Sequence, residues 1–233
     1  MLTIKVIASG STGNCYLIAD QHGNKLLLEC GIPFNSIKKA LKFNFKGVQG
    51  CLVTHEHKDH CKGIVDCLGA CIECYCSKGT AEALKLQHHR LHIVKAGEQF
   101  SIGDWQILPF EAQHDAAEPL CFLIKNGDDK LLFATDTYYI KHRFNGLTDV
   151  LIECNYDMEA LNKNIEAGSV SDTRKKRILY SHMNLDTCKG FFLANDLSQL
   201  RSIKLIHVSN DNGVVDKFKQ EIEAITGIPV TIA

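Results

Sequence analysis

The sequence has little that would indicate a membrane, secreted or disordered protein. No apolar run approaches the roughly 18 residues of a membrane-spanning helix, and the segment from Met1 to Gly10 lacks the pattern of a secretory leader. The 233 residues carry a formal net charge of −1, which excludes a broadly basic nucleic-acid coat but leaves room for a local basic patch. No Pro/Gly/Ser-rich linker or low-complexity segment divides the chain. We therefore expect one globular domain over residues 1–233, cytoplasmic and without membrane contact.

Cysteine is abundant, but paired cysteine motifs are scarce. The number of cysteines, 11, is odd, and several of them, such as Cys15, Cys30 and Cys154, lie inside apolar runs. This pattern indicates reduced thiols that pack as small apolar side chains in a reducing compartment. The single CxxC, Cys71-Ile72-Glu73-Cys74, has no second CxxC to complete a zinc knuckle. We therefore favour a strand over Cys71–Cys76 rather than a metal or redox site.

The densest group of potential metal ligands is the segment His55-Glu56-His57-Lys58-Asp59-His60. It follows a short apolar run of strand type, Cys51–Val53, and precedes a stretch of helical periodicity from Cys61 to Ala70. Alternate side chains of an extended segment point the same way, so His55 and His57 can share one cation. Asp59 and His60, at the start of a helix, can reach a second. The segment therefore predicts a hydrolytic site with two metal ions, in a loop that leaves a buried strand.

Strand-like apolar runs alternate with helical stretches along the chain, which predicts an α/β protein with two sheets flanked by helices. The expected strands are Leu2–Ile7, Cys15–Ile18, Lys25–Glu29, Trp105–Phe110, Cys121–Lys125, Lys130–Ala134, Asp149–Glu153, Ile178–Tyr180 and Lys204–Ile206, with a helix at Asn35–Leu41.

Residues that can bind metal follow these apolar runs repeatedly. They are His55, His114, Asp136, His182 and His207. Singly, each has a plain explanation as a loop or capping residue. Strand ends at one edge of a sheet share a face, and sites of α/β proteins gather there, so we expect these five side chains to belong to one site.

The HxHxDH segment, the lone His114, Asp136 in Ala134-Thr135-Asp136-Thr137 and a late histidine together resemble the metallo-β-lactamase superfamily. The opening loop Ser9-Gly10-Ser11-Thr12-Gly13-Asn14 and the segment His207–Asn212 are similar to the YycJ (WalJ) branch, which is related to the nucleases RNase Z and RNase J. The resemblance implies an α/β fold in which two mixed β-sheets form a four-layer αββα sandwich.

The resemblance also implies a set of metal ligands. His55, His57 and His114 would hold the first metal, Asp59, His60 and His207 the second, and Asp136 would bridge the two. His182, oriented by Glu153, would contact the scissile phosphate or the leaving group. The reverse assignment of His182 and His207 stays open. Such histidine-rich ligand sets suit zinc or manganese, and iron is a further option.

The implied reaction is hydrolysis of a phosphodiester by a hydroxide held between two metal ions, with Asp59 orienting the attacking water and accepting its proton. A nuclease resembling a DNA exonuclease, with a nucleic acid or nucleotide as substrate, is the leading prediction. Two alternatives remain. One is a hydrolase of the same fold that acts on a lactone, a thioester or a cyclic phosphodiester, and the other is a metal-binding or redox module without hydrolysis.

Candidate substrate contacts lie in two loops. Lys141 and Arg143 follow Asp136 and supply local positive charge, although such groups are more often solvated surface. Ser11 and Asn14 belong to the glycine-rich loop, which could offer amides to a phosphate or could equally be a tight turn. His182 is also expected to touch the substrate.

Two groups are expected to support the ligands. Thr54, Thr135 and Thr137 stand next to ligands in the sequence and are placed to hydrogen-bond them. Many members of the superfamily brace the metal-site loop with the aspartate of an Asp-x-Gly motif, where this chain has Glu29-Cys30-Gly31. The extra methylene of glutamate predicts a changed bracing geometry around an unchanged ligand set.

Overall fold

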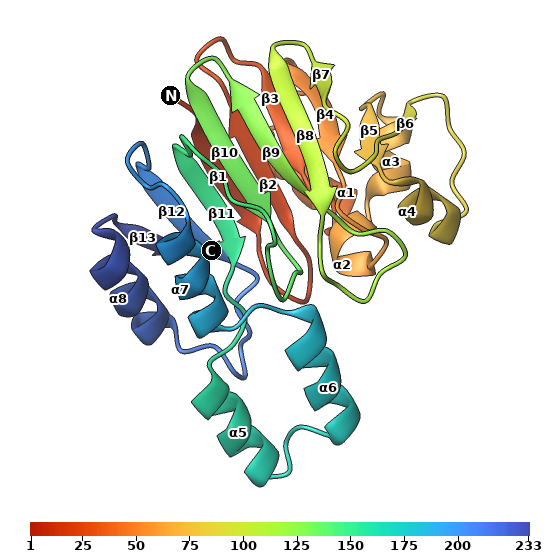
Figure 1. Cartoon of the computed structure of the whole chain (residues 1–233). Helices are drawn as coiled ribbons and strands as arrows, with labels where there is room; N and C mark the ends of the chain where they lie inside the picture. Colours follow the sequence, from red (N-terminus) through yellow and green to blue (C-terminus); the bar gives the residue numbers. More distant parts are fainter. The chain divides into compact units, whose positions relative to one another are not determined.

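The computed structural model describes all 233 residues, which form two compact units (Figure 1). Unit 1 consists of residues 1–111 and 116–129, and unit 2 of residues 112–115 and 130–233. No helix in either unit combines the length and the apolar character needed to cross a membrane. A single domain over residues 1–233 remains a prediction, and each unit is described below by itself.

Unit 1 contains nine strands and four short helices. The strands are β1 (Thr3–Ala8), β2 (Cys15–Ala19), β3 (Lys25–Leu28), β4 (Val48–Leu52), β5 (Cys74–Cys76), β6 (Leu91–Ile93), β7 (Phe100–Ile102), β8 (Trp105–Glu111) and β9 (Leu120–Asn126). The helices are α1 (Phe34–Ala40), α2 (Lys58–Cys61), α3 (Ile64–Gly69) and α4 (Lys78–Ala83).

The strands β1 to β6 form a mixed six-stranded sheet in sequence order. The pairs β1–β2 and β2–β3 are antiparallel, whereas β3, β4, β5 and β6 pair in parallel. Strand β8 pairs antiparallel with β7 on one side and with β9 on the other. Because β4 lies between two parallel neighbours, the loop after its carboxyl end, which carries His55 and His57, leaves the middle of the sheet.

The core of unit 1 is rich in cysteine. Its buried cluster includes seven thiols, those of Cys15, Cys30, Cys51, Cys61, Cys67, Cys74 and Cys76, packed with aliphatic side chains such as Leu27 and Ile64. All 11 cysteines are free, and only Cys71 is exposed. Burial raises the pKa of Cys61, and likewise that of Cys76, to about 12, so these thiols stay protonated and act as small apolar groups.

Three segments of unit 1 interlock through backbone hydrogen bonds near the histidine-rich segment. The amide of Asn14 donates to the Asp59 carbonyl at 2.7 Å, and the amide of Gly31 donates to the Asn14 carbonyl at 2.9 Å. The amide of Cys30 donates to the His60 carbonyl at 2.9 Å. A Cβ on Gly31 would lie 1.6 Å from the Asp59 carbonyl oxygen. Glycine at position 31 therefore permits the close approach that fixes helix α2.

Unit 2 is built on parallel strands. Its elements are β10 (Asp129–Ala134), β11 (Asp149–Glu153), α5 (Met158–Glu166), α6 (Asp172–Ser181), α7 (Leu185–Ala194), β12 (Ser202–Ile206), α8 (Val215–Thr226) and β13 (Val230–Ile232). Strands β10, β11, β12 and β13 pair in parallel in this order. Asp136 follows β10, Glu153 ends β11 and His207 follows β12, so all three stand at the carboxyl edge.

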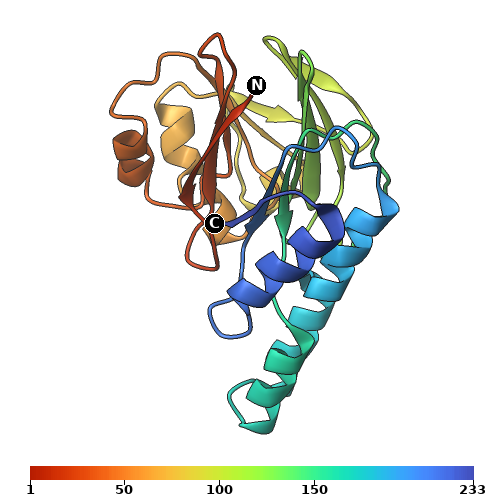
Figure 2. The ribbon, with the colours of Figure 1, turned by 90° about the vertical axis from the view of Figure 1, so that its left-hand side faces the viewer.

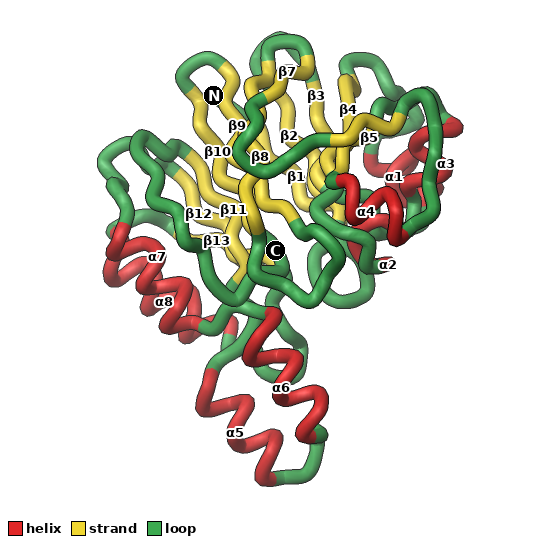
Figure 3. The backbone as a smooth tube through the Cα atoms, turned by 45° about the vertical axis from the view of Figure 1, so that its right-hand side comes forward, coloured by secondary structure: helices red, strands yellow, loops and turns green.

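Helices α7 and α8 contact each other and appear side by side in Figure 2. Helices α5 and α6 form a hairpin that extends away from the strands of unit 2 (Figure 3). Tyr156, Leu161, Val170 and Ile178 form a small buried cluster at this hairpin. The hairpin is tied to α8 by Lys217, which pairs at 2.8 Å with Asp157, the residue that caps α5.

The predicted strand at Ile178–Tyr180 is wrong, because these residues belong to helix α6. Ser171 caps this helix, and its hydroxyl accepts a hydrogen bond from the Arg174 amide. A run of three apolar residues is too short to show whether apolar residues repeat with the period of a strand or with that of a helix. His182 consequently follows the last turn of a helix rather than a strand, in the link between α6 and α7.

We expect Gly31→Ala to lower the free energy of unfolding by about 2–4 kcal/mol, because the added methyl group must displace the backbone at Asp59. Urea denaturation of both proteins measures this loss. Gly69→Ala is the matched control, since a Cβ at Gly69, in the last turn of α3, meets no atom within 4 Å. Equal destabilisation in the two variants would contradict the proposed close approach.

Candidate metal centre

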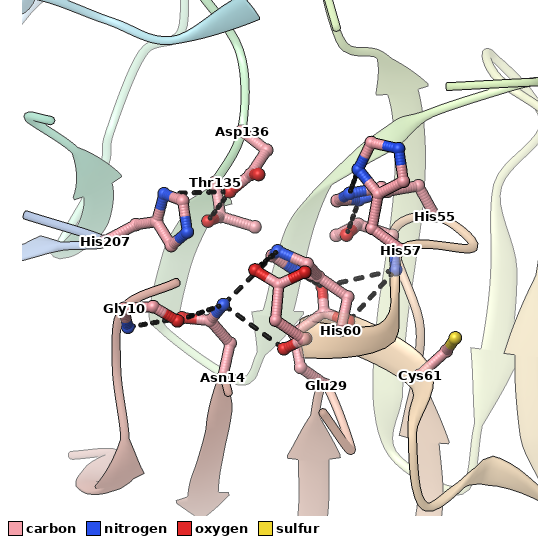
Figure 4. Close-up of polar contacts among 12 residues, drawn as sticks. Gly10, Asn14, Glu29, His55, His57, His60, Cys61, Thr135, Asp136 and His207 are labelled. Carbon is pink, nitrogen blue, oxygen red and sulfur yellow. Dashed lines mark hydrogen bonds and ion pairs between the residues drawn. The ribbon is translucent and has the colours of Figure 1, made fainter. Parts of the chain in front are cut away.

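In unit 1 the predicted ligands lie close together on two consecutive elements. His55 and His57 are in the loop after β4 (Figure 4), and Asp59 and His60 are in α2. The Nε2 atom of His55 is 3.0 Å from Nδ1 of His57, and the rings of His55 and His60 have centroids 4.1 Å apart. Nε2 of His60 is 3.3 Å from Oδ2 of Asp59. As the sequence predicted, Asp59 and His60 lie in a helix and His55 and His57 precede it, while their role as metal ligands stays a prediction.

Neighbouring side chains orient these imidazoles. The hydroxyl of Thr54 is 2.9 Å from Nδ1 of His55, which leaves Nε2 on the His57 side. The carboxamide of Asn14 donates to the Asp59 carbonyl at 3.3 Å and lies 3.2 Å from Nε2 of His60 (Figure 4). The Thr54 contact engages the ring nitrogen of His55 that faces away from His57, and contacts of this kind fix the ring orientation of histidines in metal sites.

Glu29 braces the same loop from the end of β3. It is fully buried, has a φ of 65°, and accepts a hydrogen bond from the Thr54 amide at 3.2 Å. Its Oε1 atom lies 3.7 Å from Nδ1 of His60. Glutamate at this position therefore contacts both the loop after β4 and helix α2, and the changed bracing geometry expected from its extra methylene stays a prediction.

In unit 2 the side chains of Asp136, Glu153, His182 and His207 converge. One ligand atom of each lies within 4.8 Å of one from every other. Nδ1 of His207 is 3.2 Å from Oδ1 of Asp136, which also accepts the Thr135 hydroxyl at 2.9 Å. Asp136 and His207 have φ values of 44° and 53°, left-handed conformations that are uncommon outside glycine.

His114 joins this group from residues 112–115. Its Nδ1 donates to the Ser181 carbonyl at 2.8 Å, and its Nε2 lies 3.5 Å from Oδ2 of Asp136. Burial holds the pKa of His114 below its usual value. A neutral imidazole whose Nδ1 carries the proton presents an Nε2 lone pair, which is the form that binds metal.

The side chain of Glu153 contacts four other residues of unit 2. It is fully buried, its Oε1 is 2.7 Å from Nδ1 of His182 and 3.0 Å from Nδ1 of His207, and its Oε2 accepts the amides of Thr137 and Met183. Burial alone would raise the pKa of Glu153, but His182 and His207 hold it below its usual value. Burial by itself would lower the pKa of His182, but the Glu153 carboxylate outweighs burial, so that the pKa of His182 lies above its usual value. The pair therefore favours a carboxylate beside an imidazolium.

Sequence reasoning missed two residues and placed one supporting residue differently. Asn155 donates to the His207 carbonyl at 2.7 Å, and the Ser181 carbonyl orients His114. The only sequence signal for Asn155 is a polar residue two positions after a strand end. The Thr137 hydroxyl accepts from the Gln113 amide and donates to the Tyr139 carbonyl, so it supports the backbone rather than a ligand.

The predicted substrate contacts differ in accessibility. Ser11, Lys141 and Arg143 are exposed, whereas Asn14 is fully buried. In the glycine-rich loop the Gly13 amide donates to the Gly10 carbonyl, and the Gly10 amide donates to Oδ1 of Asn14. These two amides close a tight turn, which is one of the two interpretations of this loop.

The donor sets of both units fit divalent metal ions. Adjacent ligands of a tetrahedral metal with bonds near 2.0–2.1 Å lie about 3.3 Å apart. The separations of 3.0 Å between His55 and His57 in unit 1 and of 3.5 Å between His114 and Asp136 in unit 2 are close to this value. Imidazole nitrogens and carboxylate oxygens suit zinc, manganese and iron alike.

A family model described as a β-lactamase superfamily domain matches residues 25–160. Among curated proteins, the exodeoxyribonuclease YycJ of Bacillus anthracis is 28% identical over 239 residues, covering 96% of this chain and 89% of its own length. The exodeoxyribonuclease WalJ of Streptococcus pneumoniae is 28% identical over 226 residues, covering 90% of this chain and 82% of its own.

Solved structures show the same fold at low identity. The metallo-β-lactamase fold protein YhfI of Bacillus subtilis superposes with a TM-score of 0.75 at 17% identity, covering 100% of this chain and 96% of its own. The short form of human tRNase Z gives 0.66 at 14% identity, with 100% and 96% covered. The predicted α/β fold with two mixed sheets is thus confirmed, and the chain belongs to the metallo-β-lactamase superfamily.

Proposed function

We propose that the chain is a two-metal-dependent phosphodiesterase that degrades DNA as an exonuclease. The observation that carries this proposal is the contact of 2.7 Å between Glu153 and His182 beside Asp136, since it creates an oriented proton donor for a departing oxygen. Hydrolysis of a phosphodiester needs such a donor because its leaving group is an alkoxide. The names of the curated relatives, both exodeoxyribonucleases, support the same substrate class.

We assign the metal ligands from the superfamily resemblance and from the local geometry of each unit. His55, His57 and His114 would hold one ion, Asp59, His60 and His207 the other, and Asp136 would bridge them. When bound, the two ions would supply an activated water at neutral pH and neutralise charge on the phosphate. Asp59, whose side chain is 24% exposed, would orient this water and accept its proton.

His182 rather than His207 is assigned to the substrate. The side chain of His207 is 4% exposed, and its Nδ1 lies 3.2 Å from Oδ1 of Asp136 and 3.0 Å from Oε1 of Glu153, so its burial beside the proposed bridging carboxylate favours it as the ligand. The side chain of His182 is 14% exposed, and its Nδ1 is engaged by Glu153, which directs Nε2 away from the carboxylate. Nε2 of His182 would then donate its proton to the leaving oxygen.

The purified protein is expected to contain about two divalent ions per chain when produced with zinc or manganese. His57→Ala should lower the content by about one ion, because it removes one ligand of the first ion, while the exposed His88→Ala should not. Elemental analysis by mass spectrometry gives both numbers. Full metal content in His57→Ala would refute the ligand assignment.

We expect the metal-loaded protein to shorten end-labelled DNA, and Asp136→Asn to lower kcat/KM at least 100-fold, because the bridging charge is lost. Gel analysis of labelled oligonucleotides measures both. Asp128→Asn, at an exposed turn, is the matched control. Absence of DNA cleavage by the wild type, with rapid turnover of a lactone or thioester, would favour the alternative hydrolase.

The role of His182 predicts a dependence on the leaving group. His182→Ala should slow DNA cleavage about 100- to 1000-fold but slow hydrolysis of a p-nitrophenyl phosphodiester only about tenfold, since p-nitrophenolate needs little protonation. His207→Ala should slow both substrates alike and reduce the metal content. The opposite pattern would exchange the roles of His182 and His207.

A further inference from the structure

Unit 2 contains a pocket of about 280 Å³ that the proposed metal ligands do not line. One wall is the loop of residues 139–143, which follows Asp136, and the other is helix α7 together with Met183. The backbone amide of Met183 donates to Oε2 of Glu153 at 3.1 Å. Met183 therefore connects the pocket, which it lines, to the Glu153–His182 pair.

The walls of the pocket are fixed by hydrogen bonds within unit 2. The carbonyl of Tyr139 accepts the Thr137 hydroxyl at 2.9 Å at one end of the loop, and the Phe144 amide donates to Oδ1 of Asn195 at 2.6 Å at the other. The Asn195 amide group in turn donates to the Phe191 carbonyl at 2.7 Å. The loop is thus tied to α7, and the pocket is formed before any ligand arrives.

The lining combines apolar surface with unpaired positive charge. Met183 and the ring of Phe191 are buried, and Tyr139 is 51% exposed. Lys141 and Arg143 are exposed and stand in no ion pair, unlike Lys189 of α7, which binds Glu221 at 2.7 Å. No carboxylate lines the pocket. An aromatic and aliphatic interior with cations along one wall suits a ligand that is flat and apolar at one end and anionic at the other.

The volume limits the size of that ligand. At about 30 Å³ per water molecule, 280 Å³ corresponds to roughly nine waters, which is room enough for one nucleobase. Aromatic side chains stack on bases of any identity, and lysine and arginine bind phosphates.

We propose that this pocket binds one unstacked nucleobase of a single-stranded DNA end, with Lys141 and Arg143 on the adjoining phosphates. The proposal rests on the proposed nuclease function and specifies the form of its substrate. A duplex end would have to fray before its terminal base could enter, so single strands are cut faster than blunt duplexes.

Gly190 allows a direct test. It lies in α7 on the pocket wall, and a Cβ there meets no atom within 4 Å. Gly190→Leu should fill the pocket and keep the helix, because leucine is a better helix former than glycine. Gly69→Leu, also at an open helical glycine but in unit 1, is the matched control. Thermal unfolding of both variants verifies that they fold.

We expect Gly190→Leu to lower the ratio of single-stranded oligonucleotide cleavage to bis-p-nitrophenyl phosphate hydrolysis about tenfold, whereas Gly69→Leu leaves this ratio unchanged. Tyr139→Ala should lower it several-fold and Tyr139→Phe should restore it, because stacking needs the ring and not the hydroxyl. A folded Gly190→Leu protein with the wild-type ratio would overturn the proposal.

Binding of deoxyadenosine monophosphate separates this proposal from the nuclease proposal. Calorimetry with the metal-loaded protein should show tighter binding of this nucleotide than of inorganic phosphate, and Gly190→Leu should remove the difference. If the wild type binds the nucleotide in this way but cleaves no DNA, the nuclease proposal fails and the pocket remains. If Gly190→Leu binds it as the wild type does, the pocket assignment fails, whatever the DNA activity.

Discussion

The arrangement of unit 2 depends on one buried carboxylate, that of Glu153. It receives two imidazoles, those of His182 and His207, and two backbone amides, those of Thr137 and Met183. Burying an unpaired carboxylate costs several kcal/mol, so these partners are needed for the charge to stay inside the fold. The four partners come from three segments: the loop after β10, the link between α6 and α7, and the residue after β12. A single charge therefore sets the relative positions of three loops that carry candidate site residues.

Backbone strain accompanies this arrangement. Asp136 and His207 both adopt left-handed conformations directly after parallel strands, and Glu29 does so at the end of β3 in unit 1. Such conformations cost about 1–3 kcal/mol each in residues other than glycine, and they persist only where the surroundings enforce them. Here the Thr135 hydroxyl holds Asp136, Asn155 holds the carbonyl of His207, and the Thr54 amide holds Glu29. At these three positions the chain turns after a strand and presents a polar side chain.

The sequence predicted those parts of the candidate site whose residues are close together in the sequence or follow a clear apolar run. His55 to His60 needed only spacing, and Asp136 and His207 needed only a recognisable apolar run before them. The prediction of a strand at Ile178–Tyr180 was wrong because these residues belong to helix α6, which begins after its cap at Ser171. Ile178 packs in a buried cluster with Tyr156 and Leu161, which are distant from it in the sequence. Asn155 and the Ser181 carbonyl were missed for the same reason, since their partners His207 and His114 lie 52 and 67 positions away. Glu29 was identified only because a family pattern made its position conspicuous.

A metal centre by itself recognises little more than a phosphodiester, which DNA, RNA and small diesters all contain. Selection among them must come from groups that touch the rest of the substrate. In unit 2 the proposed base pocket is connected to His182, the proposed proton donor, because Met183 lines the pocket and its backbone amide donates to Glu153. A base that fills the pocket would fix the strand relative to the carboxylate that orients His182. Binding energy from a part of the substrate that does not react would then be used for alignment, so loss of the base contact should reduce kcat as well as weaken binding.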